Sequence, residues 1–332
     1  MSHRSDQPLV SVVVPAYGRP EYLDAAVESV ADQTYGPVEL LVVDDCSPDP
    51  IRPVVDAAET GGLREVRVLR HDVNRGACAA RNTGIEAARG EYVAFLDDDD
   101  YWRPEAVERR VDAFESAGEA VGFVYAGQEY VTTDGETTNY RVPETRGWVT
   151  RDLFRGAPLC PFSSVMVRRS AAEAAGPLDT RFPSWQDREW YLRLSEVCAF
   201  EAVADPLVVR RVDSHGKISD DYERKRDVSY PLFLEKHRPL ARKYGKRHEN
   251  ALVAAQSRSL AHSAIENGYH ADAVRLLLRS VRYDPTQTSS YPLLAVSLGG
   301  ERTVDAARRL KRFAERLRGR REFRTSGSET NV

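Results

Sequence analysis

The 332-residue sequence has few cysteines, no long apolar run and no excess of basic residues, and each absence argues against a class of protein. Its four cysteines (Cys46, Cys78, Cys160 and Cys198) form no C-x-x-C pair and have no histidine nearby at zinc-ligand spacing, so we expect them to be reduced packing residues. No stretch approaches the roughly 20 apolar residues of a membrane span, and residues 1–8 lack the apolar core of a signal peptide. The net charge of −4 gives no general attraction to nucleic acid. We therefore expect a cytoplasmic protein without a nucleic-acid partner.

What is present is the composition of an ordinary globular protein, 42% hydrophobic and 30% charged, with enough length for one large α/β domain and a smaller unit. Short apolar runs alternate with helical patterns over residues 9–103, which predicts right-handed crossovers and a mainly parallel sheet. Ligands bind beyond the carboxyl ends of the strands in such sheets. We predict a disordered start (1–8), an α/β domain (9–219, with halves 9–103 and 104–219), a helical region (220–323) and a disordered tail (324–332).

Two of the predicted strands end in carboxylates. Residues 92–96 read as a buried strand that runs into Asp97–Asp100, and residues 38–43 run into Asp44 and Asp45. Neighbouring carboxylates repel one another unless a cation neutralises them, and their hard oxygens suit Mg²⁺ or Mn²⁺. The alternative is a solvated turn in which Asp99 or Asp100 caps a helix beginning near Pro104. Acidic residues at both strand ends favour a binding site.

The order of the motifs resembles that of family 2 glycosyltransferases, which have the GT-A fold. The resemblance rests on an ordered series over about a hundred residues and continues more faintly to about residue 220. Its elements are residues 10–20, Ser29 with Gln33 to Tyr35, residues 39–49, Asn74 to Gly76, Ala80 to Asn82 with Gly84, and residues 90–102.

The resemblance implies a site for a nucleoside diphosphate sugar. Asp45 corresponds to the acid that contacts the base, and a carboxylate accepts hydrogen bonds from the ring N–H of uracil, thymine or guanine without choosing among them. Arg81 is implied to lie near the diphosphate, and the alternative is an exposed helix residue paired with Glu86 or Asp45. The implied donor-binding residues are Pro15, Ala16, Tyr17, Arg19, Asp44, Asp45, Gly76, Arg81, Asp97 and Asp98.

The family's D-x-D element matches Asp97-Asp98-Asp99. By this resemblance Asp99 binds Mn²⁺ or Mg²⁺, Asp97 or Asp98 holds the ribose or the waters of the metal, and Asp97 is also a candidate metal ligand. The metal bridges the donor diphosphate and neutralises charge on the leaving group. His215 resembles a further ligand near the diphosphate and Lys217 a phosphate contact, although a histidine in such a loop is more often solvated.

Asp187 matches the family's catalytic base. Inversion needs a base on the acceptor side of the sugar, and one carboxylate suffices. The family commonly has Glu-Asp here, and this sequence has Gln186-Asp187. Glu189 is the fallback, on a different helix face, and the structural alternative for Asp187 is an acid favoured by the helix dipole. Trp185 stacks on an acceptor sugar or, as we prefer, packs in the core.

The second half continues with a predicted strand at 121–125, a hairpin at 128–140 and a strand at 163–169 before a helix. From about residue 220 the pattern is helical, with predicted helices at 222–244, 248–267, 271–283 and 303–317. Residues 257–286 resemble one tetratricopeptide-type hairpin, read as a structural brace rather than a docking surface. The last helix is basic and amphipathic, either solvated or resting peripherally on the inner face of the membrane.

These features predict a metal-dependent inverting glycosyltransferase. It would move a sugar from a UDP-, GDP- or dTDP-linked donor to a saccharide or lipid-linked acceptor. A sugar-phosphate nucleotidyltransferase is the second candidate, but residues 15–19 lack a glycine-rich loop with lysine. A non-catalytic metal-binding scaffold ranks third, because Tyr101 and Arg103 break the calcium-loop pattern.

Overall fold

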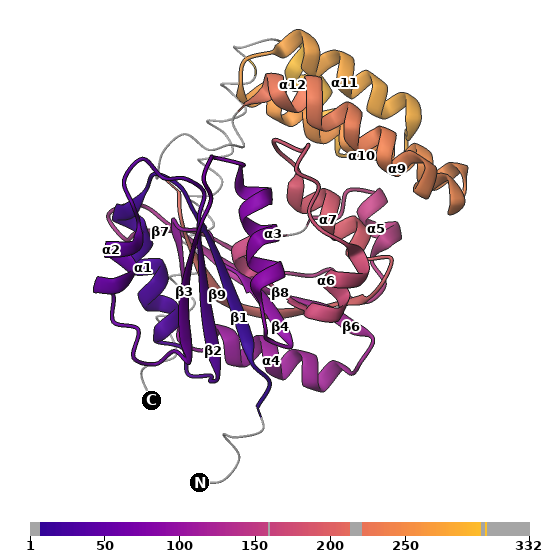
Figure 1. Cartoon of the computed structure of the whole chain (residues 1–332). Coiled ribbons are helices and arrows are strands. Elements are labelled where there is room, and N and C mark those ends of the chain that lie inside the picture. The colour runs from indigo at the N-terminus through magenta and orange to yellow at the C-terminus, as the bar shows by residue number, and fades with distance from the viewer. Residues whose placement is uncertain (1–6, 159, 213–220, 300–302, 304–332) are drawn as a thin grey trace, which may run out of the picture. The chain divides into compact units, whose positions relative to one another are not determined.

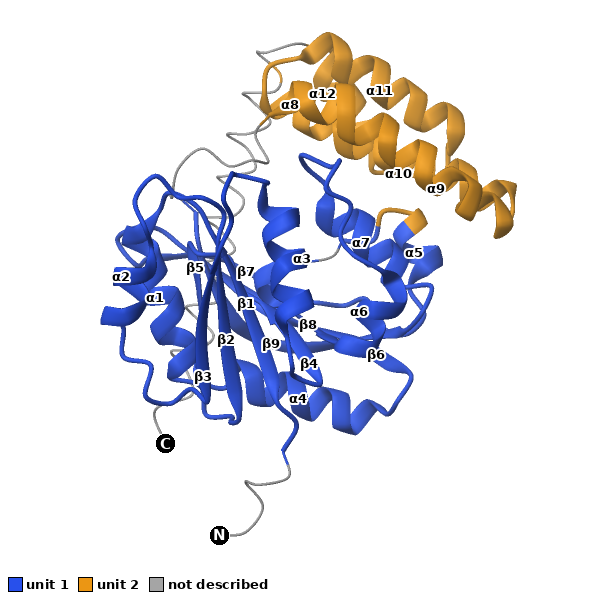
Figure 2. Ribbon diagram, in the orientation of Figure 1, with its two compact units in different colours: residues 1–153, 157–218 blue, residues 154–156, 219–332 orange. Residues whose placement is uncertain are grey.

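The computed structural model describes residues 7–158, 160–212, 221–299 and 303. The chain divides into two compact units, Met1–Leu153 with Ala157–Ile218, and Phe154–Gly156 with Ser219–Val332 (Figure 2). His215, Lys217, nearly all of the predicted helix at 303–317 and the tail at 324–332 lie outside the described residues.

One mixed sheet runs through the first unit, with the strand order β3-β2-β1-β4-β8-β6-β9-β5 and β7 paired with β6 (Figure 1). Parallel pairing joins β1 to β2 and β4, β2 to β3, and β6 to β9, whereas β5, β7 and β8 pair antiparallel. The predicted α/β class with a mainly parallel sheet is therefore confirmed. The strands are β1 (Val10–Ala16), β2 (Val38–Asp44), β3 (Glu65–Arg70), β4 (Tyr92–Phe95), β5 (Asp100–Trp102), β6 (Val121–Val131), β7 (Thr137–Arg141), β8 (Val165–Arg168) and β9 (Ala199–Arg211).

Helices cover both faces of the parallel part of the sheet, which is why β1, β2 and β4 are buried along their whole length. Alternate residues of β1 (Val10, Val12 and Val14) share one apolar core with residues of α1 and α4. On the other face α3 packs so closely that a Cβ atom at Gly84 would lie 2.2 Å from a Val13 methyl group. The helices are α1 (Pro20–Ala31), α2 (Arg52–Ala57), α3 (Ala77–Ala87), α4 (Ala106–Ala117), α5 (Thr150–Phe154), α6 (Arg169–Ala175) and α7 (Gln186–Leu194).

Several predicted boundaries differ from the structure. The helix expected near Pro104 begins at Ala106 with Glu105 at its N-cap, so neither Asp99 nor Asp100 caps it. Asp100 instead opens β5, which pairs with β9. The strand expected at 121–125 continues as β6 to Val131, because β9 pairs with it over most of its length. The strand expected at 163–169 begins only at Val165, after a 3₁₀ turn.

The second unit is helical, which confirms the predicted helical region. The single helix predicted at 222–244 is wrong, because a π-helical turn (Lys225–Ser229) separates α8 from α9, and the helix α12 was not predicted. Small buried residues, among them Ala261, Ala264 and Ala273, lie on the paired helices α10 and α11. The likeness of this hairpin to a tetratricopeptide unit stays a prediction. The helices are α8 (Tyr222–Arg224), α9 (Tyr230–Lys243), α10 (Lys246–Glu266), α11 (His270–Tyr283) and α12 (Ser290–Leu298).

A buried glutamate joins α9 to α10. Glu249 is 0% exposed and accepts hydrogen bonds from Arg238, Arg242 and Lys246. These cations hold the pKa of Glu249 at about 2, against the opposing effect of burial.

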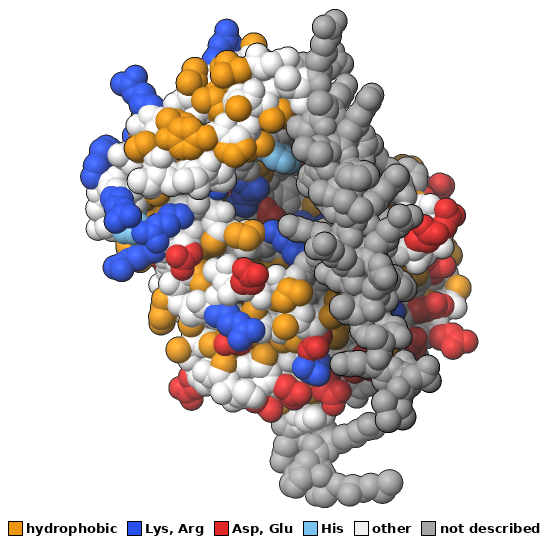
Figure 3. Space-filling view, turned by 180° about the vertical axis from the view of Figure 1, so that it is seen from behind, with side chains coloured by type: hydrophobic (Ala, Val, Ile, Leu, Met, Phe, Trp, Pro, Cys, Tyr) orange, Lys and Arg blue, Asp and Glu red, His pale blue; other side chains and the backbone are white. Residues whose placement is uncertain are grey.

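Lys and Arg side chains (blue) also gather on the upper left of Figure 3, over the helices of this unit. Among the helices that the structure describes, none combines the length and apolar character needed to span a membrane.

Candidate functional site

The acidic run Asp97–Asp100 lies between β4 and β5, at the carboxyl end of β4. One carboxylate oxygen from each of Asp97, Asp99 and Asp100 lies within 4.8 Å of the others. The Ser163 hydroxyl ties the turn together, because it accepts the Asp97 N–H (3.2 Å) and donates to the Asp100 carboxylate (2.6 Å). The run is therefore a folded cluster rather than a solvated turn.

Arginines from three separate elements face this cluster. They come from the loop before α1, from α3 and from β9, so the tertiary fold supplies part of the neutralising charge that four adjacent carboxylates require. Arg19 contacts Asp98 and also Asp99 (2.8 Å), Arg81 contacts Asp97 (2.5 Å), and Arg210 contacts Asp100 (3.2 Å).

Burial and these arginines give three of the four carboxylates different pKa values. Burial raises the pKa of Asp98 to about 7, although Arg19 opposes the shift. Burial likewise raises the pKa of Asp100 to about 6 against the effect of Arg210. Burial alone would raise the pKa of Asp97, but the Arg81 guanidinium holds it below its usual range.

The donor set fits a hard divalent cation. Three carboxylates from Asp97, Asp99 and Asp100 offer oxygen ligands on one short turn, which suits Mg²⁺ or Mn²⁺ better than a softer metal. Asp97 and Asp99 were predicted from the sequence, whereas Asp100 was not. His215, the third predicted ligand, lies outside the described residues.

The loop after β1 reaches this cluster. Pro15 and Ala16 complete β1, and the next residue, Tyr17, is 48% exposed and donates its backbone N–H to Asp98 (3.4 Å). The Gly18 N–H, one residue further on, donates to the Ser47 hydroxyl (3.1 Å) in the loop after β2. The predicted donor-binding loops thus lie together at the carboxyl ends of β1, β2 and β4.

Asp44 and Asp45 occupy different environments at the end of β2. Asp44 is buried, contacts Arg70 and accepts the Ser47 N–H (2.8 Å), so it fixes the loop in which it lies. Asp45 is 3% exposed and takes its hydrogen bonds from other segments: His71 Nδ1 (2.7 Å), the Arg75 N–H (2.8 Å) and the Gly76 N–H (2.6 Å). Gly76 adopts φ +85°, a conformation that favours glycine, at the N-cap of α3.

Arg81 is buried and central to the site. Its guanidinium lies 4.1 Å from the centre of the Phe162 ring, pairs with Asp97 and donates to the Gln186 side-chain oxygen (3.3 Å). The alternative that Arg81 is an exposed helix residue paired with Glu86 or Asp45 is wrong. Arg81 therefore connects the acidic run to the first residue of α7.

Asp187 lies in the first turn of α7, next to Gln186. It is partly exposed, and its carboxylate accepts the Arg188 N–H (2.8 Å). The helix follows Trp185, which has φ +65° and is 7% exposed, so most of this indole lies in the protein interior. The start of α7 thus presents a carboxylate one residue from the contact with Arg81.

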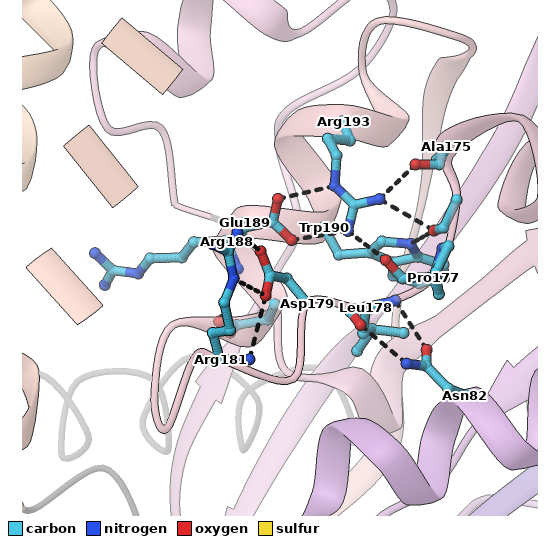
Figure 4. Close-up of polar contacts among 12 residues, drawn as sticks. Asn82, Ala175, Pro177, Leu178, Asp179, Arg181, Arg188, Glu189, Trp190 and Arg193 are labelled. Carbon is cyan, nitrogen blue, oxygen red and sulfur yellow. Dashed lines mark hydrogen bonds and ion pairs between the residues drawn. The ribbon is translucent and has the colours of Figure 1, made fainter. Parts of the chain in front are cut away.

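Glu189, the predicted fallback base, has a different environment. It is 1% exposed and bonds twice to Arg193, and Arg193 in turn donates to the carbonyl groups of Ala175, Gly176 and Pro177 (Figure 4). In the same view Asn82 exchanges two hydrogen bonds with the backbone of Leu178. Glu189 therefore anchors α7 to the chain before it, and Asn82 anchors that chain to α3.

Ser163, His71 and Arg210 were not predicted as site residues, and Asp100 was considered only as part of the acidic run or as a helix N-cap. Ser163 and His71 contact the acidic residues from positions 63 and 26 residues away in the chain, and no short motif marks such contacts. Asp100 was visible in the acidic run, but only the fold separates it from Asp98, which turns toward Tyr17 and Arg19.

Comparisons with known proteins agree with this geometry. The model of glycosyl transferase family 2 matches residues 11–176. A Bacillus subtilis protein described as a candidate teichuronic acid biosynthesis glycosyltransferase, TuaG, is 36% identical over 129 residues, which are 39% of this chain and 50% of TuaG. The chain thus spans about half the length of that curated relative.

Two solved structures share the fold. S. aureus TarS in complex with UDP-GlcNAc superposes with a TM-score of 0.65 and 20% identity, covering 91% of this chain and 92% of that one. The mannosyltransferase PcManGT of Pyrobaculum calidifontis, in complex with GDP-Man and Mn²⁺, gives a TM-score of 0.54 and 20% identity, with coverage of 88% and 86%. At these identities the likeness establishes the fold.

Proposed function

The chain belongs to glycosyl transferase family 2, and we propose that it transfers a sugar, with inversion and with a divalent metal, from a nucleoside diphosphate donor to a saccharide or lipid-linked acceptor. The observation that carries this proposal is the convergence of one acidic cluster with two other carboxylates. The Asp45 N–H donates to the carbonyl of Ala16 (3.0 Å), and the next residue, Tyr17, donates its N–H to Asp98. Arg81 joins Asp97 of the run to Gln186, the residue before Asp187.

The donor binds at the carboxyl ends of β1, β2 and β4. Tyr17 offers an exposed aromatic ring for the nucleoside, and Asp45 offers a carboxylate for the base. Asp97 and Asp99, with Asp100, hold Mn²⁺ or Mg²⁺, which supplies neutralising charge for the departing diphosphate. The complex of PcManGT with GDP-Man and Mn²⁺ supports a metal here.

Asp187 serves as the base that removes the acceptor hydroxyl proton. Its partial exposure gives an acceptor access, and its neighbour Gln186 is linked through Arg81 to Asp97 of the acidic run. The neighbouring Gln186 side-chain oxygen accepts from Arg81, so Gln186 positions the helix start without supplying a second base.

The acceptor is a growing saccharide. The name of TuaG, which refers to teichuronic acid biosynthesis, supports a polysaccharide acceptor, free or lipid-linked. Arg19, which contacts both Asp98 and Asp99, is close enough to the cluster to meet donor phosphate once the metal is bound.

The test compares Asp187→Asn with the unchanged protein. We expect transfer of sugar from the donor to fall at least 10³-fold while nucleoside diphosphate binding, measured by calorimetry with Mn²⁺, changes less than threefold. The exposed Asp152→Asn is the matched control and should retain activity. Unchanged transfer in Asp187→Asn would refute the assigned base, and absence of nucleotide binding in the wild type would refute the function itself.

A further inference from the structure

A histidine outside all predicted site residues contacts the carboxylate proposed to bind the base. His71 follows β3 directly and is 8% exposed. Its Nδ1 lies 2.7 Å from Asp45 Oδ1, and its Nε2 lies 2.9 Å from the Thr83 hydroxyl on α3. Because a carboxylate only accepts, Nδ1 carries the proton in this pair, and Thr83 fixes the orientation of the ring from the other side.

The hydrogen bonds around Asp45 can be counted. A carboxylate has about four acceptor positions, two on each oxygen. Oδ1 accepts from His71 and from the Arg75 N–H, so both of its positions are used. Oδ2 accepts from the Gly76 N–H alone, so one position remains. Asp45 is 3% exposed, so little of its carboxylate surface is left for further hydrogen-bond donors.

We propose that His71 is a specificity-determining residue that restricts the donor to a uracil or thymine nucleotide. Uracil and thymine each present one ring N–H, at N3, which matches one open acceptor position. Guanine presents two adjacent donors, N1–H and N2–H, and a carboxylate satisfies both only if each oxygen has an open position. With both positions of Oδ1 filled by His71 and the Arg75 N–H, one guanine donor finds no open position on the carboxylate, which costs binding free energy.

Cytosine is disfavoured for a different reason. Its exocyclic N4–H can donate to the open position on Oδ2, but its ring N3 is an acceptor and would then lie against Oδ1, which also only accepts, so these two atoms repel. The inference rests on the proposed function, because it assumes that Asp45 contacts the base.

The test measures the ratio of dissociation constants for GDP and UDP. Calorimetry with UDP, dTDP, GDP and CDP in the presence of Mn²⁺ should show UDP and dTDP binding at least tenfold more tightly than GDP and CDP to the wild-type protein. In His71→Ala the freed position on Oδ1 should let guanine pair with both oxygens, so the GDP/UDP ratio should fall at least fivefold.

A conservative variant separates this role from a merely structural one. His71→Asn places an amide N–H near the position of Nδ1 and should restore the wild-type ratio, whereas general loosening would weaken both nucleotides equally and leave the ratio unchanged. Thr83→Val, which removes the support of the ring without removing the histidine, should lower the ratio to an intermediate value, with Thr83→Ser as its control. Thermal melts followed by circular dichroism establish that each variant is folded.

The outcomes distinguish the two proposals. If the wild type binds GDP as tightly as UDP, or if His71→Ala and Thr83→Val both keep the wild-type ratio, the specificity role of His71 is wrong while the glycosyltransferase proposal stands. If none of the four nucleotides binds, the proposed function fails.

Discussion

Replacing Arg81 by methionine tests whether this buried arginine holds the site together. The Arg81 side chain is 7% exposed and that of Asp97 is 24% exposed, so methionine leaves a largely buried carboxylate without its 2.5 Å partner. Removing one member of a buried ion pair costs about 3–5 kcal/mol. Because Asp97 keeps some exposure, we expect the free energy of unfolding to fall by only about 2–3 kcal/mol. Roughly 1 kcal/mol of this comes from the lost stacking of the Arg81 guanidinium on Phe162.

Urea denaturation of Arg81→Met, Asp97→Asn and the double variant gives the coupling free energy between the two side chains. We expect about 1–2 kcal/mol of coupling, because the charge left alone in each single variant is absent from the double variant. The matched control is Arg89→Met, since Arg89 forms an exposed pair with Glu65 at 2.7 Å and its loss should cost less than about 0.5 kcal/mol. A coupling no larger than that of the Arg89 pair would refute the central role of Arg81.

Three further predictions concern other contacts. Arg19→Gln removes a cation from Asp98 and Asp99, so Mn²⁺ binding without nucleotide should tighten several-fold in calorimetry, and a weaker affinity would contradict this role. The pKa of Glu249 is depressed to about 2, so its contribution to the free energy of unfolding is present above about pH 4.5 and is lost as the pH falls toward 2. Glu249→Gln should therefore lower the free energy of unfolding at pH 7. The loss should be only about 1–2 kcal/mol, because the cationic partners of Glu249 are mostly exposed, and it should shrink in acid. Asn82→Ala breaks two hydrogen bonds to the Leu178 backbone and should lower the free energy of unfolding by about 1–2 kcal/mol, measured in urea. Asn82→Asp should not recover this loss, because its second carboxylate oxygen faces the Leu178 carbonyl oxygen, and a stability equal to that of the unchanged protein would contradict the paired contact.

The strands of residues 9–103 were predictable because their apolar runs are continuous and end abruptly. Residues 92–96 could lie only in a buried strand, and such a strand delivers whatever follows it to one edge of the sheet. The identity of that following segment, Asp97–Asp100, therefore indicates a cation site from the sequence alone. The same logic placed Asp45 and Tyr17 at the same edge.

Boundaries in the second half were less predictable because pairing partners there come from distant segments. β6 runs past the predicted end because β9, some 80 residues later, pairs with it as far as Val131, where the nearby β7 also pairs with it. The predicted helix at 222–244 breaks into α8, a π turn and α9, and the one helix-start signal at that break, Pro231 in the first turn of α9, was not used in the prediction.

The sequence by itself determined the α/β class, the acidic strand ends and the family, because strand burial and motif order are local properties of the chain. Only the tertiary structure decided which side chain each carboxylate meets: Arg81 for Asp97, Arg19 for Asp98, Arg210 for Asp100 and His71 for Asp45. These partners lie between 16 and 110 residues away along the chain. Charge pairing depends on distance in space, and that distance is set by how the strands order themselves in the sheet.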